Sequence, residues 1–373
     1  MATYRFDEIA INSTKKKKPT EEDKAHYIGL EHIDPGCFNI VRWGSDVAPT
    51  GDKLLMQKGD VLFGKRRAYQ RKVGIAPFDG IFSAHGMVLR PNTEIIDANY
   101  FPFFISSDRF METAVRISVG GLSPTINWKD LAKQEFDLPP LEEQKVLADK
   151  LWAAYRLKEG YKKLLVATDE MVKSQFIEMF GNTSKEMLGK FIQVIRGVSY
   201  KPSDVKTADD PDTAVILRSN NINDANLNTD EVVYINKNRV SGDQYLRVND
   251  IVVCASNGSK ALVGKAAINK TLTNQYAHGA FCLLVRPNDN INPVYLNTFF
   301  QTSLYKKQID ELAAGSNILN IKQEYLTNMI LPLPIIEEQN KFAIIAEQAD
   351  KSKFELKQCI ENIDKVIKSL ING

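Results

Sequence analysis

The chain carries one sequence pattern twice, and this internal repeat restricts the possible folds more than any other feature. The segment Leu-Pro-Pro-Leu-Glu-Glu-Gln at 138–144 recurs as Leu-Pro-Ile-Ile-Glu-Glu-Gln at 333–339, an offset of 195 residues. Nearer the start of each copy the offset is 190, where Asp-Val-Leu-Phe at 60–63 matches Asp-Ile-Val-Val at 250–253. Single residues also match at the offset of 195: Tyr100 with Tyr295, Phe104 with Phe299, Ile126 with Ile321 and Leu131 with Leu326. The sequence therefore predicts two homologous domains whose loops are free to differ.

Each copy alternates short strand patterns with turns and then changes to helix patterns. Runs at 60–63, 74–76 and 87–89 are rich in β-branched and other apolar residues and are bounded by turn residues, which is typical of strands. The segments 99–115 and 293–312 carry apolar residues three and four positions apart, as amphipathic helices do. Each copy is therefore expected to form an α+β domain of about 140 to 150 residues.

A long amphipathic helix is expected after each Glu-Glu-Gln motif, because acidic residues favour the first helical turn. Residues in the second helix recur at alternating steps of three and four, as in a coiled-coil seam: Phe342, Ile345, Ala349, Ser352, Leu356, Cys359, Ile363, Val366 and Leu370. The equivalent seam in the first helix is Leu147, Lys150, Ala154, Leu157, Tyr161, Leu164, Thr168, Met171 and Gln175. Helices of this kind would be about 50 to 60 Å long, more than a domain of this size needs for its own core. We therefore expect the two helices to pack on each other.

These elements predict an α+β architecture with two homologous α/β domains joined by two long antiparallel helices that form a coiled coil, with pseudo-twofold symmetry. The expected boundaries are 1–138 for the first domain, 139–182 for the first helix, 183–333 for the second domain and 334–373 for the second helix. A chain of 373 residues has room for this number of separate cores.

Composition and cysteine usage favour a soluble cytoplasmic protein with no membrane partner. The hydrophobic fraction is 43% and the charged fraction 25%, and no apolar segment is long enough to span a bilayer. The N-terminus lacks the apolar core of a signal peptide. Cys37, Cys254, Cys282 and Cys359 are widely separated and form no Cys-x-x-Cys pair, so we expect reduced thiols.

The net charge of +2 conceals one strongly basic segment, Lys53–Lys72, which contains seven basic residues and one acidic residue. It includes the loop Gly-Lys-Arg-Arg-Ala-Tyr-Gln-Arg-Lys at 64–72, which corresponds to Cys-Ala-Ser-Asn-Gly-Ser-Lys-Ala-Leu at 254–262. Two dissimilar polar loops on one scaffold are suited to the recognition of two different DNA segments. Arg can bind guanine and Asn or Gln can bind adenine through paired hydrogen bonds, whereas Lys commonly binds phosphate without base choice.

The candidate DNA-binding residues come from the two loops and from a segment that follows a predicted strand. They are Lys65, Arg66, Arg67, Tyr69, Gln70, Arg71 and Lys72 in the first loop, Ser256, Asn257, Ser259 and Lys260 in the second loop, and Arg218, Asn220 and Asn221 in the third segment. Lys65, Lys72 and Lys260 are as well suited to phosphate as to bases. Lys15–Lys18 is a further phosphate candidate, although a run of charge is usually a solvated surface.

The repeated Glu-Glu-Gln helix starts, the Gly-Asp-Val-Leu-Phe and Asn-Asp-Ile-Val-Val strands and the Arg-Pro turns resemble the specificity subunits of type I restriction-modification enzymes. The resemblance covers essentially the whole chain. It implies two target-recognition domains, each binding one half of a bipartite, asymmetric site in double-stranded DNA. It also implies two methyltransferase subunits that bind S-adenosylmethionine, and restriction and translocase subunits that join for cleavage. This chain would then hold no cofactor and would not be an enzyme.

The absence of catalytic motifs agrees with that division of labour. The sequence contains no Asp/Asn-Pro-Pro-Tyr/Phe methylation tetrad and no Gly-Lys-Ser/Thr phosphate loop, and its four histidines lack metal-ligand spacing, so no catalytic or metal residue is expected. His85 and His278 are expected to be structural, and Cys359 is expected to be a small core residue of the seam. Two alternatives stay open: the recognition part of a fused methyltransferase-nuclease, and a coiled-coil scaffold that binds only proteins.

Overall fold

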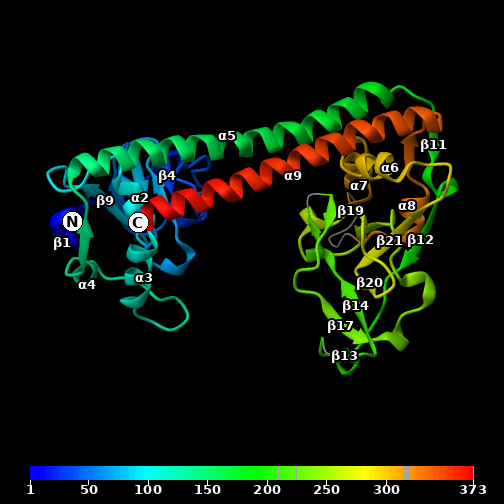
Figure 1. The fold of residues 1–373 in the computed structure, drawn as a ribbon, viewed down its shortest axis with the longest axis horizontal. Coiled ribbons are helices and arrows are strands. Elements are labelled where there is room, and N and C mark those ends of the chain that lie inside the picture. Colours follow the sequence, from blue (N-terminus) through cyan, green and yellow to red (C-terminus); the bar gives the residue numbers. More distant parts are fainter. Residues whose placement is uncertain (209, 224, 314–319, 373) are drawn as a thin grey trace. The chain divides into compact units, whose positions relative to one another are not determined.

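The computed structural model describes residues 1–208, 210–223, 225–313 and 320–372, and the chain divides into two compact units (Figure 1). Unit 1 comprises Met1–Lys162 and Gln358–Gly373, and unit 2 comprises Lys163–Lys357. Each unit therefore contains one globular domain together with a piece of both long helices. None of the described helices combines the length and the apolar character that crossing a membrane would require.

Unit 1 contains two four-stranded sheets and one two-stranded sheet. The first sheet is antiparallel and has the order β2 (Ala10–Ser13), β9 (Met87–Pro91), β6 (Val61–Phe63) and β7 (Val73–Ile75). The second has the order β3 (Lys16–Lys17), β5 (Lys53–Met56), β8 (Gly80–Phe82) and β4 (Tyr27–Ile28), of which only the last two are parallel neighbours. β1 (Ala2–Arg5) pairs with β10 (Glu135–Leu138). The three strands predicted at 60–63, 74–76 and 87–89 are confirmed.

Unit 2 differs from unit 1 in the strand order of its second sheet, whereas its first sheet repeats that of unit 1 with two further strands. Its six strands have the order β12 (Ile192–Arg196), β21 (Cys282–Pro287), β18 (Ile251–Cys254), β19 (Ala266–Ile268), β16 (Asn226–Leu227) and β15 (Ile222–Asn223). The second sheet has the order β13 (Val205–Lys206), β17 (Val233–Asn236), β14 (Thr213–Leu217) and β20 (Tyr276–His278), and β11 (Lys185–Met187) pairs with β22 (Ile330–Pro332). The first four strands of the large sheet stand in the same order as β2, β9, β6 and β7, which confirms that the two domains are homologous.

The short helices differ from the prediction in one respect. They are α1 (Phe6–Ile9), α2 (Phe101–Ser106), α3 (Asp108–Arg116) and α4 (Trp128–Leu131) in unit 1, and α6 (Pro293–Phe299), α7 (Ser303–Ala313) and α8 (Gln323–Thr327) in unit 2. The helical patterns predicted at 99–115 and 293–312 are confirmed, but each segment is divided into two helices. Ser107 adopts an extended conformation and its Oγ accepts a hydrogen bond from the Phe110 amide at 3.1 Å, so a new helix begins there.

The Gln of each repeated Glu-Glu-Gln motif fastens a long helix to its domain. Gln144 is buried, accepts a hydrogen bond from the Asp97 amide at 2.9 Å and donates to the Ile95 and Pro139 carbonyls. Gln339 is equally buried, accepts from the Asn292 amide at 2.9 Å and donates to the Pro334 carbonyl. Burying an amide side chain is favourable only when its polar atoms are satisfied, so this repeated residue has a structural role.

The long helices are α5 (Leu141–Phe180) and α9 (Ile336–Asn372), which begin and end close to the predicted boundaries; residue 373 lies outside the described part of the chain. In unit 2, Phe176 and Phe180 near the end of α5 pack against Phe342 near the start of α9, with ring centroids 5.4 and 5.6 Å apart. In unit 1, the last turns of α9 lie against the first half of α5, where Ile367 packs on the cluster that contains Leu151. The helix segments within each unit therefore run antiparallel, as predicted (Figure 1). The twofold relation between the two units stays a prediction.

An ion pair joins the two long helices inside each unit. Lys158 Nζ lies 2.6 Å from Asp364 in unit 1, and Lys353 Nζ lies 2.7 Å from Asp169 in unit 2. The two lysines are equivalent at the offset of 195, and so are the two aspartates. The duplication has therefore preserved a charged contact between the helices.

The predicted seam has the wrong register in α5 and is wrong at alternate positions in α9. Leu157, Leu164 and Met171 of α5 are about half exposed (48%, 49% and 50%), and Cys359 and Val366 of α9 are also exposed. In α5 the inward-facing residues lie one position away from the predicted seam: Ala148, Leu151, Tyr155, Lys158, Val172 and Phe176. In α9 they include the predicted Phe342 and Ala349 and are shifted by one position at Ala346, Lys353, Ile360 and Ile367. This inner line includes Lys158 and Lys353, whose charges are neutralised by aspartates on the other long helix. Because the two lysines are charged, a pattern of apolar residues alone does not identify this line. The expectation that Cys359 is a core residue is therefore wrong.

Candidate nucleic-acid interface

The first-copy loop, residues 64–72, connects β6 to β7 and has an unusual backbone. The Gly64 amide donates to the Lys72 carbonyl at 2.9 Å and closes the loop. Between them, Ala68–Gln70 form one turn of 3-10 helix flanked by Arg67 and Arg71, whose φ angles are 57° and 52°. A left-handed backbone costs energy for residues other than glycine and persists only where the surroundings enforce it. The loop is therefore held in one defined shape.

A short hairpin holds the first half of this loop. Val119 pairs with Thr125 across it, and Gly120 adopts a φ of 112° at its turn. The Arg67 amide donates to the Pro124 carbonyl at 2.7 Å, and the Arg67 guanidinium donates to Ser123 Oγ at 3.0 and 3.2 Å. The tip of the hairpin presents Leu122, which is 97% exposed. Sequence reasoning missed this hairpin, for which Gly120-Gly121 and Pro124 were the available turn signals.

Two further predicted DNA-binding residues are engaged within the protein. Arg71 Nη2 donates to the Ser106 carbonyl and to Asp108 Oδ1, both at 2.8 Å. Lys72 Nζ donates to the Leu30 carbonyl at 2.6 Å. These contacts favour a role in shaping the first-copy loop. Arg66, Tyr69 and Gln70 then stand out as the side chains of this loop that are best placed to contact a ligand, and Tyr69 is 55% exposed.

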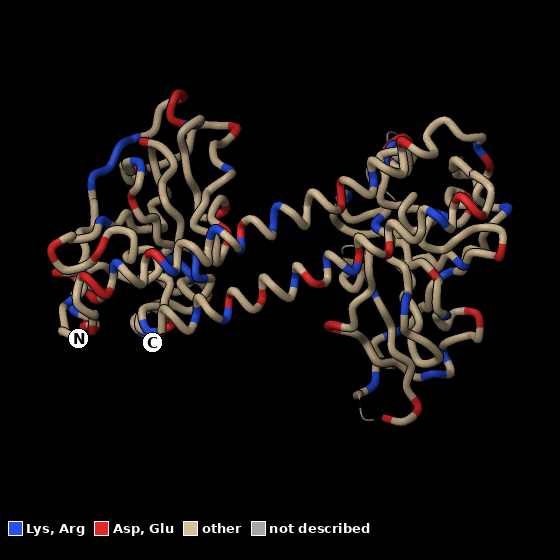
Figure 2. The backbone as a smooth tube through the Cα atoms, turned by 45° about the horizontal axis from the view of Figure 1, so that its top comes forward, with Lys and Arg blue, Asp and Glu red and all other residues tan. Residues whose placement is uncertain are grey.

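Positive charge gathers at the start of the first-copy loop. Arg66 Nη1 lies 3.5 Å from His85 Nε2, and burial together with the charges of Arg66, Lys65 and Lys53 lowers the pKa of His85. Burial and the charge of Lys16 lower the pKa of Lys65. The charged groups that shift these two pKa values are all cationic, so the cluster favours an anionic partner such as phosphate. Lys16 belongs to the four consecutive lysines 15–18, which form a continuous blue stretch in Figure 2.

In unit 2 the structure brings together the two segments that were predicted separately. The second-copy loop, residues 254–262, follows β18, and the second-copy turn, residues 218–221, follows β14. Asn257 Nδ2 donates to Ser219 Oγ at 3.0 Å and joins the two segments, and Asn257 Oδ1 accepts from the Ser259 amide at 2.9 Å. Ser259, Lys260 and Asn220 are exposed, whereas Ser256 and Asn257 are partly buried.

Asn221 and Arg218 have internal partners in the second-copy turn. Asn221 is fully buried; its Oδ1 accepts from the Arg218 amide at 2.8 Å and its Nδ2 donates to the Asp230 carbonyl at 2.6 Å. Arg218 Nη2 donates to the Glu231 carbonyl at 2.7 Å, although the rest of this side chain is exposed. A fully buried amide with both ends bonded cannot reach a DNA base without unfolding the turn, so the structure favours a structural role for Asn221.

The first copy has an equivalent turn that sequence reasoning missed. The first-copy turn, residues 29–32, follows β4, and His32 Nδ1 accepts from the Gly29 amide at 2.9 Å as Asn221 does from Arg218. The Lys72–Leu30 hydrogen bond ties it to the first-copy loop. The strand β4 has only two residues, and a histidine stands where the second copy has an asparagine, so the repeat is invisible here in the sequence.

The two loops are also anchored at the same point of the scaffold. The Ile126 amide donates to the Lys65 carbonyl at 3.0 Å, and the Ile321 amide donates to the Ala255 carbonyl at 2.8 Å. Both isoleucines are buried and are equivalent at the offset of 195. Each unit therefore presents one loop and one turn on the same framework, with different exposed side chains.

The described residues include no group of three or more His, Cys, Asp or Glu side chains that could hold a metal ion. His278 is fully buried, its Nε2 lies 3.2 Å from the Ile195 carbonyl, and burial lowers its pKa to about 4. The structure therefore confirms a structural role for His278. His85 is instead exposed and belongs to the cationic cluster.

Fold and site together define a tandem-repeat protein that presents two dissimilar polar surfaces on matching frameworks. The chain matches the type I restriction modification DNA specificity domain twice, over residues 2–165 and 187–365, and it belongs to that family.

The chain is also similar to two curated relatives. Over 169 residues it is 36% identical to the type I restriction enzyme StySPI specificity subunit of Salmonella potsdam. This match covers 44% of this chain and 36% of the relative. Over 184 residues it is 32% identical to the EcoKI specificity subunit of Escherichia coli strain K12. This match covers 48% of this chain and 39% of the relative. The matched stretches thus span well under half of either relative.

A similar fold occurs in a solved chain from work on the structural basis of complex assembly and conformational transition of the type I R-M system. The TM-score is 0.59 at 18% sequence identity, and the superposition covers 99% of this chain and 96% of the solved one. At this identity the likeness concerns the fold alone.

Proposed function

We propose that the chain is the non-catalytic DNA-specificity subunit of a type I restriction-modification complex and recognises a bipartite, asymmetric site in double-stranded DNA. One observation carries the proposal: the same loop-and-turn framework occurs in both units and presents different exposed side chains in each. A repeated framework with variable contact residues is suited to recognising two different short sequences.

The residues of the first unit divide into three roles. Arg66, Tyr69 and Gln70 are proposed to contact base edges, since Arg and Gln offer paired hydrogen bonds to guanine and adenine. Lys65 and Lys16 are proposed to contact phosphates, because their positive charges reinforce each other at the same surface. Arg67, Arg71 and Lys72 are proposed to hold the loop in shape, and the first two retain exposed surface.

In the second unit, Asn220, Ser259 and Lys260 are exposed members of the predicted set and are proposed to contact DNA directly. Asn257 and Ser219 would hold the loop against the turn, since their hydrogen bond joins the two segments. Ser256 and Arg218 are partly engaged with their own unit and would adjust this surface, while Asn221 supports it from inside.

The proposal includes partners that supply the chemistry. Two methyltransferase subunits would bind S-adenosylmethionine and modify the site, restriction and translocase subunits would cleave unmodified DNA, and the assembly would work in the cytoplasm. The exposed Leu157, Leu164 and Met171 support this, because a helix that shows apolar side chains to solvent is typical of a protein-binding surface.

The experiment is a comparison of DNA binding and methyl transfer by the purified full chain. We expect it to bind duplex DNA with an affinity that falls steeply with salt, and to transfer no methyl group until matching methyltransferase subunits are added. Lys65→Ala is expected to weaken binding to all duplexes and to lower the salt dependence by about one ion. Methyl transfer by the isolated chain would contradict the proposal, and salt-insensitive binding would favour a scaffold that binds only proteins.

A further inference from the structure

We propose that Asp108 is a positioning residue that ties the first-copy loop to the last turns of α9, so that this part of α9 determines how the loop meets DNA. The inference rests on the proposed function and adds a specificity-determining contact to it. Five residues form the contact, which we call the Asp108 clasp: Arg71, Ser106, Asp108, Lys368 and Asn372.

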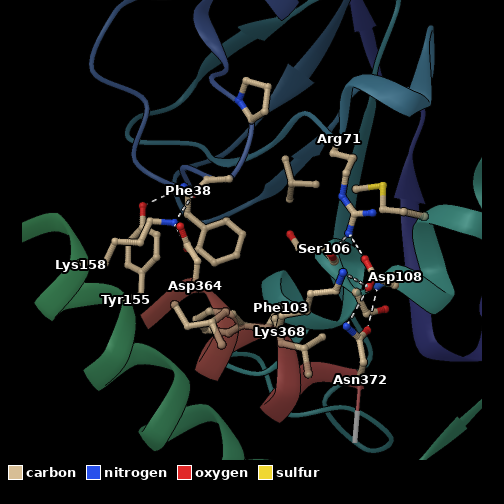
Figure 3. A pocket seen from close by; sticks show the side chains of 17 residues that line it. Phe38, Arg71, Phe103, Ser106, Asp108, Tyr155, Lys158, Asp364, Lys368 and Asn372 are labelled. Atoms are coloured by element: carbon tan, nitrogen blue, oxygen red, sulfur yellow. Dashed lines mark hydrogen bonds and ion pairs between the residues drawn. The ribbon is translucent and has the colours of Figure 1, made fainter. Parts of the chain in front are cut away.

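Asp108 lies at the centre of the clasp (Figure 3). Its Oδ1 accepts from Arg71 Nη2 at 2.8 Å, and its Oδ2 lies 3.2 Å from Lys368 Nζ. Asn372 binds it twice, because the Asp108 amide donates to Asn372 Oδ1 at 2.9 Å and Asn372 Nδ2 donates to Asp108 Oδ2 at 3.1 Å. One carboxylate thus connects the first-copy loop with the last turns of α9.

The clasp acts on a residue that fixes the shape of the loop. Arg71 has a left-handed backbone and ends the 3-10 turn that presents Tyr69 and Gln70, and its amide donates to the Ala68 carbonyl at 2.8 Å. This conformation is maintained only while contacts outside the loop hold it. Release of the Arg71 side chain would therefore let the neighbouring Tyr69 and Gln70 change direction.

Apolar packing alone does not hold Arg71, because its side chain is 43% exposed and borders a pocket of about 510 Å³. The pocket is bordered by Phe38, Val73 and Phe103 from the domain and by Ile367 and Ile371 from α9. Side chains that border a cavity make fewer contacts than those of a filled core. The position of Arg71 thus depends mainly on its polar contacts with Ser106 and Asp108.

The second copy lacks the clasp and uses another anchor. At the equivalent positions it has Ala261 for Arg71 and Ser303 for Asp108, and Lys173, the equivalent of Lys368, pairs with Glu170 at 2.9 Å. There the buried Tyr305 hydroxyl donates to the Gly264 carbonyl at 2.9 Å, on the return from the second-copy loop. The first copy has Phe110 at that position, which has no hydroxyl. The clasp therefore anchors the loop in the first unit, whereas a single tyrosine anchors the loop in the second unit.

The test is selection of bound duplexes from a random pool by the full-length chain and its variants. Asp108→Ala is expected to reduce discrimination between bases about tenfold in one part of the selected motif and to leave the other part unchanged. Lys368→Ala should cause a smaller loss of about two- to threefold in the same part, because Lys368 is largely exposed. Lys173→Ala is the matched control in the second unit and should leave both parts as in the original chain.

Several outcomes separate positioning from a general structural defect. Lys368→Arg keeps the charge and should restore discrimination, which loss of stability alone would not allow. If Asp108→Ala fails to fold, the exposed Lys368 variants carry the test. Unchanged base choice in both variants would contradict the proposed role of Asp108. An equal loss of base discrimination in both parts of the motif would contradict it as well. An original chain that selects no two-part motif would instead overturn the proposed function.

Discussion

At the scale of single residues, the two Ala-His-Gly segments of the chain show how differently one side chain can be used. His85 is exposed and has cationic neighbours, which suits contact with phosphate. His278 is fully buried in unit 2, and its Nδ1 has no hydrogen-bond partner among the described residues. A histidine in such surroundings stays neutral, because the protonated ring would lose its hydration without gaining a compensating charge.

The buried His278 predicts that the chain loses stability in mild acid. Its pKa is lowered to about 4 in the folded chain, against 6.5 as the reference value. The unfolded chain therefore binds the additional proton, so this contribution is fully present above pH 6.5 and is lost as the pH falls toward 4. At pH 5 the expected loss from this residue is about 2 kcal/mol in the free energy of unfolding.

Urea unfolding at pH 7 and pH 5 measures this loss. His278→Gln removes the titrating group, so the variant should be less sensitive to this change of pH than the original chain. An equal pH dependence in the two proteins would show that other groups cause the acid sensitivity.

At the scale of secondary-structure elements, the repeat made the strands and the long helices predictable, since each element could be checked against its second copy. The register of the helix pair could not be predicted in this way. In α9 the predicted and the observed lines of inward-facing residues share Phe342, Ala349 and Leu356 and differ at the residues between them. The structure selects the line that contains Lys158 and Lys353, whose partners Asp364 and Asp169 stand on the other helix and leave no signal in a single helix pattern.

Alanine substitutions in α5 test this register. Leu151 is fully buried, so Leu151→Ala should lower the free energy of unfolding by about 3 kcal/mol, because a cavity replaces its side chain. Leu157 is 48% exposed and belongs to the rejected seam, so Leu157→Ala should change the free energy of unfolding by at most about 0.5 kcal/mol. Equal destabilisation by the two substitutions would contradict the observed register.

The candidate site was only partly predictable for a similar reason. The differing loops at 64–72 and 254–262 were evident from the alignment of the two copies. Which basic side chains remain available depends on partners distant in the sequence, such as Asp108 for Arg71 and Leu30 for Lys72. A single sequence gives no sign of such contacts, so it could not show which of the basic side chains are bonded within the protein.

At the scale of the whole molecule, duplication gives each unit its own core, its own helix contact and its own polar surface. The interhelical ion pairs and the buried glutamines are repeated, whereas the loop residues and their anchors differ. Scaffold and contact surface have thus diverged to different extents, and each unit is expected to recognise its DNA segment independently of the other.

Selection of duplexes by two single-site variants tests this independence most directly. The variants are Arg66→Ala in the first-copy loop and Asn220→Ala in the second-copy turn, both measured in the full-length chain with the same random pool. We expect the original chain to select a two-part motif and each variant to relax base choice in a different part of it. Relaxation of the same part by both variants, or a uniform loss at every position, would contradict it.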